Sequence, residues 1–305
     1  QKVIAFSLPL MLSSCLQLLF NAADVIVVGR FAGSTSLAAV GSTTELLSLL
    51  TTLFIGFSIG ANVNVARTLG NQDDQGTKDG IHTAVSVSIL SGSAMILLGF
   101  LFGRPMLQWM GTPADVIDKA SLYLMIIFIG MPSNMAYNFG SAILRAMGDT
   151  KRPLYFLSAA GVLNVVLNLI FVIVLHMDVA GVALATILSE TLSAVLILNC
   201  LCRTDGPCHL NIRKLYIQKD QLIRMLRIGL PAGIQSGMFS FSNVLIQSSI
   251  NSFDDTTLVA ASSAASSIEN FVYANVNAFY QANTAFTSQN FGAGQYDRCR
   301  KIFRQ

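Results

Sequence analysis

The stretch LPLMLSSCLQLLFNAADVIVVGR, Leu8 to Arg30, is a long apolar run that contains one carboxylate, Asp24. From Val3 to Val28 the chain has one proline, Pro9, and no other charged residue. An apolar run of this length, folded as a helix, spans the roughly 30 Å of a bilayer's hydrocarbon core. The stretch therefore predicts a membrane-spanning helix with an acid inside it.

The composition extends this prediction to the whole chain. Charged residues make up 11% of the sequence, against roughly 25% in ordinary soluble domains, and the mean hydropathy is +0.60. We therefore expect an all-α polytopic membrane protein and exclude an ordinary soluble domain. The apolar windows predict eight spans: Val3–Val28, Leu37–Ala66, Ile81–Phe102, Ala120–Leu144, Leu154–Leu175, Val179–Leu201, Leu222–Ile250 and Leu258–Thr287.

Basic residues divide unequally between the two sides that these spans define. All lysines and arginines except Arg30, Arg104 and Lys119 fall on the side of the N-terminus. Cytoplasmic segments carry such an excess, so the pattern predicts a cytoplasmic N-terminus and supports the number of spans. The net charge of +3 gives no indication of a nucleic-acid partner, and we expect the lipid bilayer as the surrounding medium.

The start of the chain also resembles its end at a constant offset of 222 positions. Leu8-Pro9 falls on Leu230-Pro231, Asn21 on Asn243 and Gly70 on Gly292. Chance similarity between two apolar hairpins is the alternative. We interpret the last two spans as a second, parallel copy of the first two, which predicts a two-lobe transporter-like plan of twelve helices, six in each lobe.

This plan predicts three regions. Residues 1–202 form an N-lobe with six spans, 203–227 a basic amphipathic linker on the cytoplasmic surface, and 228–305 the start of a C-lobe with two spans. We expect the sequence to be a fragment, with four helices of the second lobe outside it.

Polar residues inside the spans mark a candidate site. Gln17, Asn21 and Asp24 are spaced four and three apart, so they share one face of the first helix. An acid at such a depth costs roughly 2.5–3.5 kcal/mol on insertion scales and is functional by default. Apolar surroundings disfavour charge, so we expect a carboxyl that gains and loses a proton. A structural carboxylate paired with Asn21 is the alternative.

Other spans carry polar pairs at helical spacing. These pairs predict either a hydrated pocket in the first bundle or polar contacts between helices. They are Asn134 with Asn138, Asn164 with Asn168, and Thr186 with Glu190.

Two more acids, Glu45 and Glu269, also lie within spans and are candidate secondary acids together with Glu190. The cluster of Cys200, Cys202, Cys208 and His209 matches no zinc spacing, so we expect no metal site.

Several of these segments together resemble one transporter family. They are LPLMLSSCLQLLFNAADVIVVGR, AAVGS, LRAMGDTKRP, LNVVLNLIF, GVALAT and SQNFGAGQYDR, in order along nearly the whole chain. The chain resembles the multidrug and toxic compound extrusion (MATE) family of cation-coupled antiporters, whose twelve-helix, two-lobe plan agrees with the repeat.

The resemblance implies specific roles. Asp24 matches the first-helix acid that binds the coupling proton or sodium ion, and Asn164 and Thr186 match its polar partners. Asn168 departs from the pattern, because many relatives have Asp there. The seventh span, GIQSGMFSFSNVLIQSSI, lacks the Glu of some branches. Both departures make Asp24 the main expected coupling group.

The implied function is export of amphipathic, often cationic, compounds across a bacterial cytoplasmic membrane by a monomer, with H⁺ or Na⁺ as coupling ion and no cofactor. Cation-site candidates are Asp24, Asn21, Asn164, Asn168 and Thr186. Substrate-pocket candidates are Gln17, Asn134, Asn138 and Asn243.

The sequence leaves rival functions to weigh. A lipid-linked oligosaccharide flippase shares the two-lobe plan, but we expect it to line its cavity with several basic residues, which these spans lack. An intramembrane hydrolase needs paired acids in a GxGD-type motif or an HExxH motif, and neither occurs. No P-loop is present either, so we expect a secondary transporter and not an enzyme.

Overall fold

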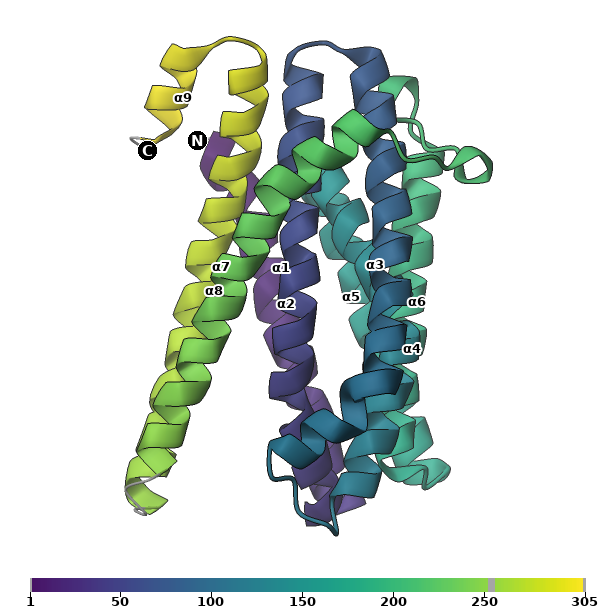
Figure 1. The fold of residues 1–305 in the computed structure, drawn as a ribbon, viewed down its shortest axis with the longest axis vertical. Coiled ribbons are helices and arrows are strands. Elements are labelled where there is room, and N and C mark those ends of the chain that lie inside the picture. Colours follow the sequence, from purple (N-terminus) through teal and green to yellow (C-terminus); the bar gives the residue numbers. More distant parts are fainter. Residues whose placement is uncertain (1, 252–255, 304–305) are drawn as a thin grey trace.

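The computed structural model describes residues 2–251 and 256–303, and these are almost entirely helical. Each of the eight predicted spans falls on one long helix or on a helix and its π-helical extension. Figure 1 shows these elements. The elements are α1 (Lys2–Val27), η1 (Val28–Ala32), α2 (Ser34–Gly70), α3 (Asp74–Trp109), α4 (Ile117–Ala146), α5 (Lys151–Asn168), η2 (Leu169–Val174), α6 (Asp178–Cys202), η3 (Gly206–Cys208), η4 (Ile212–Lys214), α7 (Lys219–Asn251), α8 (Thr256–Gly292) and α9 (Tyr296–Phe303).

Six helices of the described chain, α1 to α6, are long and apolar enough to cross a membrane. Helices α7 and α8 are as long, with 33 and 37 residues, but they carry more Ser, Asn and Gln. The first turns of α7 occupy the end of the predicted linker 203–227, since the helix begins at Lys219.

Helix α4 forms the centre of the first six helices and packs against α2, α3 and α6. It is the most buried of the six. Its fully buried side chains include Leu124, Phe128, Met135 and Phe139. This core fixes the helices that carry the polar pairs.

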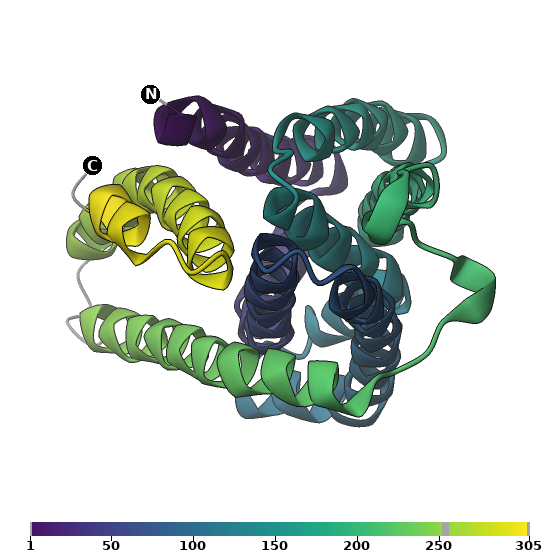
Figure 2. The same cartoon turned by 90° about the horizontal axis from the view of Figure 1, so that it is seen from above.

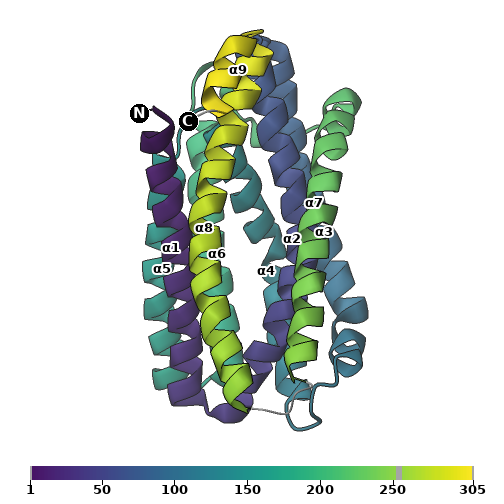
Figure 3. The same cartoon turned by 90° about the vertical axis from the view of Figure 1, so that its left-hand side faces the viewer.

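Helices α7 and α8 both pack against the α1–α2 hairpin. Helix α8 runs beside α1, and α7 crosses α2 (Figures 2 and 3). From the end where the N-terminus lies, α7 and α8 diverge from α2 towards the opposite end (Figure 1). Helices α7 and α8 therefore contact the first six helices mainly at the end where the N-terminus lies.

The 222-residue repeat is present in three dimensions. The same offset carries both ends of α2, Ser34 and Gly70, onto the ends of α8, Thr256 and Gly292. It also carries the start of α3, Asp74, onto the start of α9, Tyr296. The bounds of α8 and the start of α9 thus agree with the predicted repeat, while α7 begins at Lys219, five residues before the position related to the start of α1.

A reciprocal contact relates the two copies. A Cβ on Gly70 would clash with the backbone carbonyl of Gln289, and a Cβ on Gly292 would clash with that of Arg67. Arg67 and Gln289 are themselves repeat-related, so α2 and α8 meet about a local two-fold axis.

Helices α2 and α7 also approach closely through glycine. A Cβ on Gly56 would clash with the backbone of Gly233, and a Cβ on Gly60 would clash with the backbone carbonyl of Met225. Gly229 in turn lies against Gly56 and Phe57. We call this the glycine contact. Small residues of this kind let membrane helices pack backbone to backbone.

We expect Gly60→Val to reduce the free energy of unfolding by about 1–3 kcal/mol, because the backbone that meets the new side chain cannot rotate away. Helix content followed by circular dichroism during denaturant unfolding measures this. The control is Gly237→Val on α7, where nothing lies within 4 Å of an added Cβ. Equal losses in both variants would contradict a close α2–α7 contact.

Candidate functional site

Asp24 is held by a side chain from a distant part of the chain. The Nδ2 of Asn168, at the end of α5, donates a hydrogen bond of 2.5 Å to Asp24 Oδ1 on α1. Asn168 is fully buried and Asp24 is half-buried. The carboxyl predicted to be the central group therefore lies between two helices, with an amide as its partner.

The hydrogen bonds continue from α5 to α6. Asn168 Nδ2 also donates to Asn164 Oδ1 at 3.1 Å, and Asn164 Nδ2 donates to Thr186 Oγ1 at 3.5 Å. Thr186 Oγ1 donates to the carbonyl of Val182 at 3.0 Å. Four of the five predicted cation-site residues, all except Asn21, thus form one group, the Asp24 group (Asp24, Asn164, Asn168 and Thr186).

One atom of the Asp24 group has no partner within the described residues. Asn168 Oδ1 is buried and accepts no hydrogen bond there. An unpaired buried acceptor costs free energy, about 1–3 kcal/mol, unless a donor or a cation reaches it. This oxygen is therefore available to a proton donor or an ion at the site.

Both helices that meet at Asp24 change geometry next to it. The π-helical segment η1 starts four residues after Asp24, and η2 starts directly after Asn168. The two segments pack against each other. Short π-helical turns are frequent at functional sites, and here each one ends its helix.

A second polar group lies between α4 and α6. Asn134 Nδ2 donates to Glu190 Oε1 at 2.7 Å, and Asn138 Nδ2 donates to both the carbonyl and Oδ1 of Asn134 at 2.9 Å. Ser133 and Thr191 share a hydrogen bond of 3.1 Å beside them. Glu190 is one turn beyond Thr186 on α6, which connects the two groups.

The sequence reasoning missed Tyr123, Ser133 and Thr191. Tyr123 of α4 is buried, and the charges of both Asp24 and Glu190 reach it. Polar side chains next in sequence to predicted ones, such as Ser133 beside Asn134, were the available signal. Tyr123 offered none, because a tyrosine in an apolar span also occurs as ordinary core.

The remaining predicted residues lie apart from these groups. Gln17 and Asn21 on α1, Asn243 on α7 and Glu269 on α8 are all exposed, and no hydrogen bond joins any of them to the Asp24 group in the described part of the chain. The side chain of Glu45 falls outside the described residues. Asp24 is thus paired with Asn168 and not with its helix neighbour Asn21.

No metal centre is found among the described residues. They contain no group of three or more His, Cys, Asp and Glu side chains that could hold a metal ion. Cys200, Cys202 and Cys208 are free thiols.

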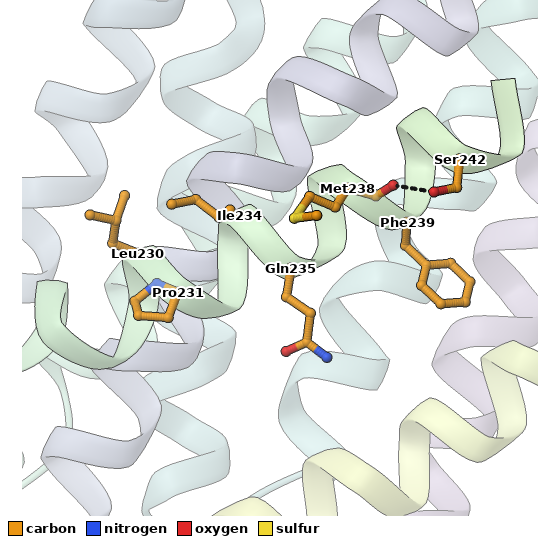
Figure 4. Close-up of a pocket in the computed structure, with 7 residues that line it drawn as sticks. All are labelled: Leu230, Pro231, Ile234, Gln235, Met238, Phe239 and Ser242. Atoms are coloured by element: carbon orange, nitrogen blue, oxygen red, sulfur yellow. Dashed lines mark hydrogen bonds between the residues drawn. The ribbon is translucent and has the colours of Figure 1, made fainter. Parts of the chain in front are cut away.

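An apolar cavity of about 580 Å³ lies along α7, as Figure 4 shows. Its lining includes the side chains of Ile234, Met238 and Phe239, with Gln235 as the amide. The hydroxyl of Ser242 donates to the Met238 carbonyl. The lining residues carry no charge, so this cavity suits an apolar or amphipathic partner and is distinct from the Asp24 group.

Comparison with known proteins identifies the family. The MatE family model matches residues 9–170 and 231–305, which is most of the chain and includes Asp24 and both copies of the repeat. The chain belongs to the MatE family. Members of this family are transporters and not enzymes, so the predicted family, the all-helical fold and the polytopic membrane class are confirmed.

Individual relatives agree with this assignment. The chain is 30% identical over 302 residues to "Probable multidrug resistance protein YpnP" and 28% identical over 306 residues to "Probable multidrug resistance protein YoeA", both of Bacillus subtilis (strain 168). Each match covers 98% of this chain and 66% of the relative. The MatE chain therefore spans about two thirds of their length.

A solved structure shares the fold. The "Outward-facing conformation of a multidrug resistance MATE family transporter of the MOP superfamily" superposes with a TM-score of 0.91 at 24% identity. The superposition covers 99% of this chain and 67% of that structure.

Replacing Asn168 by leucine tests the Asp24 group as a structural element. We expect Asn168→Leu to reduce the free energy of unfolding by about 1–3 kcal/mol, because it leaves a buried carboxyl oxygen without its donor. Thermal unfolding in detergent measures the change. The control is Asn275→Leu on α8. The Asn275 amide donates to the carbonyl of Phe271, one turn earlier on the same helix, so its removal breaks no hydrogen bond between helices. A loss in Asn168→Leu no larger than in this control would show that the Asp24–Asn168 bond contributes little.

Proposed function

We propose that the protein is a proton-coupled antiporter that exports amphipathic cations across a bacterial cytoplasmic membrane, with Asp24 as the proton carrier. The hydrogen bond between Asp24 and Asn168 inside the first six helices is the observation that carries this proposal. Membrane acids held by neighbouring helices recur in proton and ion relays.

The chemistry of the Asp24 group favours a proton over sodium. Ionised Asp24 accepts from Asn168 Nδ2 while Asn168 Oδ1 stays unpaired. When Asp24 is protonated, its O–H group can donate a hydrogen bond to the unpaired Asn168 Oδ1. Hard cations instead need several oxygen ligands, and in this group one of the two lone pairs of Asn164 Oδ1 already accepts a hydrogen bond from Asn168.

Competition at one carboxyl couples the two movements. An organic cation is attracted to the ionised form of Asp24, and uptake of a proton removes that charge and weakens the attraction. Binding of either species thus reduces binding of the other, as linkage requires. Glu190 and its amide partners form a second polar surface that an amphipathic cation can contact.

Alternating access follows from the arrangement of the two copies. Most basic residues lie at the end of the bundle where α2 meets α7 and α8, and this end is the cytoplasmic one if the positive-inside rule holds. The close contacts there support a state closed to the cytoplasm. Rocking of residues 1–202 against the lobe that begins with α7 then closes the site to one side of the membrane and opens it to the other.

The energetics suffice for export without ATP. One-for-one exchange of a proton for a monovalent cation moves no net charge, so the pH gradient drives it. Each pH unit provides about 1.4 kcal/mol, which supports a substrate gradient of about tenfold.

Removing the carboxyl of Asp24 tests the proposal. The assay measures uptake of a fluorescent cationic dye into proteoliposomes with an imposed pH gradient. We expect Asp24→Asn to reduce this uptake by more than about tenfold, because an amide side chain cannot gain and lose a proton as a carboxyl does. A sodium gradient imposed at equal pH on both sides identifies the ion.

The matched control is Glu269→Gln, which neutralises an exposed acid on α8 and is expected to transport like wild type. Unchanged transport by Asp24→Asn would assign Asp24 a structural role. Uptake driven by sodium alone would replace the proton as coupling ion.

A further inference from the structure

A second cavity, of about 660 Å³, lies beside the glycine contact at the end of α2 and the start of α7. We call it the arginine pocket. It lies one turn beyond Gly60 along α2, so it continues the line of contact between the two helices. Its lining residues are Val63, Asn64, Arg67, Thr68, Asn71, Asp73, Arg224, Arg227 and Ile228.

Three arginine residues from two helices line this pocket. Arg67 comes from α2, and Arg224 and Arg227 come from α7. None of the ion pairs among the described residues involves them. The single acid of the lining, Asp73, accepts a hydrogen bond of 2.8 Å from the backbone N–H of Gly76 and so caps α3.

Polar side chains of the lining have partners in the surrounding helices. The guanidinium of Arg67 lies 4.9 Å from the ring centroid of Phe291 on α8, at the edge of the pocket. Asn64 Nδ2 donates to Gln221 Oε1 at 2.7 Å. Like charges around one cavity repel each other, so the pocket is stabilised by any anion that enters it.

The repeat provides an internal comparison. The 222-residue offset relates the α2–α7 contact to the α8–α1 contact, where Asn64 becomes Phe286 and Ile228 becomes Phe6. Those two phenylalanine rings pack edge to face with centroids 4.9 Å apart, in an apolar cluster with three alanines of α8. The space that is a polar cavity in one copy is therefore filled in the other.

The arginines are also specific to one copy. The positions related to Arg67 and Arg227 are Gln289 and Ala5, and only Arg224 has a basic counterpart, Lys2. The positive-inside rule explains basic residues at this end, but it does not explain why three of them converge on one cavity while the equivalent contact is apolar.

We propose that the arginine pocket binds a phosphate group, from an anionic lipid headgroup or from free phosphate, and that this anion bridges α2 and α7. A guanidinium group can donate two parallel N–H···O hydrogen bonds to two oxygens of one phosphate. Because the arginines come from both sides of the glycine contact, the bound phosphate holds that contact closed. The site is separate from the Asp24 group and does not depend on proton coupling.

The test uses the protein in nanodiscs and measures its thermal unfolding midpoint. The three conditions are neutral phosphatidylcholine alone, the same lipid with added phosphatidylglycerol, and the neutral lipid with inorganic phosphate at ionic strength matched by sodium chloride. We expect a rise of about 2–4 °C in at least one of the two conditions that add a phosphate with net negative charge, from phosphatidylglycerol or from inorganic phosphate. A rise with phosphatidylglycerol only identifies the lipid, and a rise with both identifies phosphate in general.

Two charge-matched variants decide where the anion binds. In Arg67→Gln/Arg224→Gln/Arg227→Gln we expect the rise to vanish, while the midpoint in neutral lipid stays at or above that of wild type because the repulsion is gone. In Arg213→Gln/Lys214→Gln/Lys219→Gln, which removes three exposed charges outside the pocket, the rise is expected to persist. No rise in wild type, or an equal rise in both variants, overturns the proposal.

Discussion

A carboxyl group inside hydrocarbon has no water to solvate it, so Asp24 depends on donors from neighbouring helices. Asn168 of α5 is that donor, and Asn164 and Thr186 extend the hydrogen bonds to α6. One acid thereby links α1, α5 and α6. The pairing also leaves one amide oxygen buried and unpaired, which is the feature that makes the group responsive to a proton.

A second constraint lies in the contact between α2 and α7, which must change if the protein alternates between two states. These two helices meet where glycines remove the side chains between them. A contact of bare backbones is dense when closed, and it exposes little apolar side chain when it opens. The arginine pocket beside it adds a charge-dependent connection, so the lipid or ionic environment can bias which state is populated.

Much of this architecture could be predicted from sequence, because membrane-spanning helices are recognised in a sequence by their length and apolar composition. The offset of 222 residues predicted the match of α2 with α8, and helical spacing predicted Asn164 and Asn168 as a pair. The sequence could not show which side chain pairs with Asp24. Helical spacing shows which residues share one face of a helix, but it does not show which face of the neighbouring helix they meet. No sequence pattern predicted the π-helical turns after Asp24 and Asn168. Tyr123 could not be distinguished by sequence from an ordinary core residue.

The central claim is that Asp24 exchanges a proton for an organic cation. The most direct measurement is proton release from the purified protein in weakly buffered detergent, followed with a pH indicator while a cationic dye is added. The account predicts release of about one proton for each cation bound, and none from Asp24→Asn. Binding of the dye by wild type without proton release, or equal release from Asp24→Asn, would contradict it.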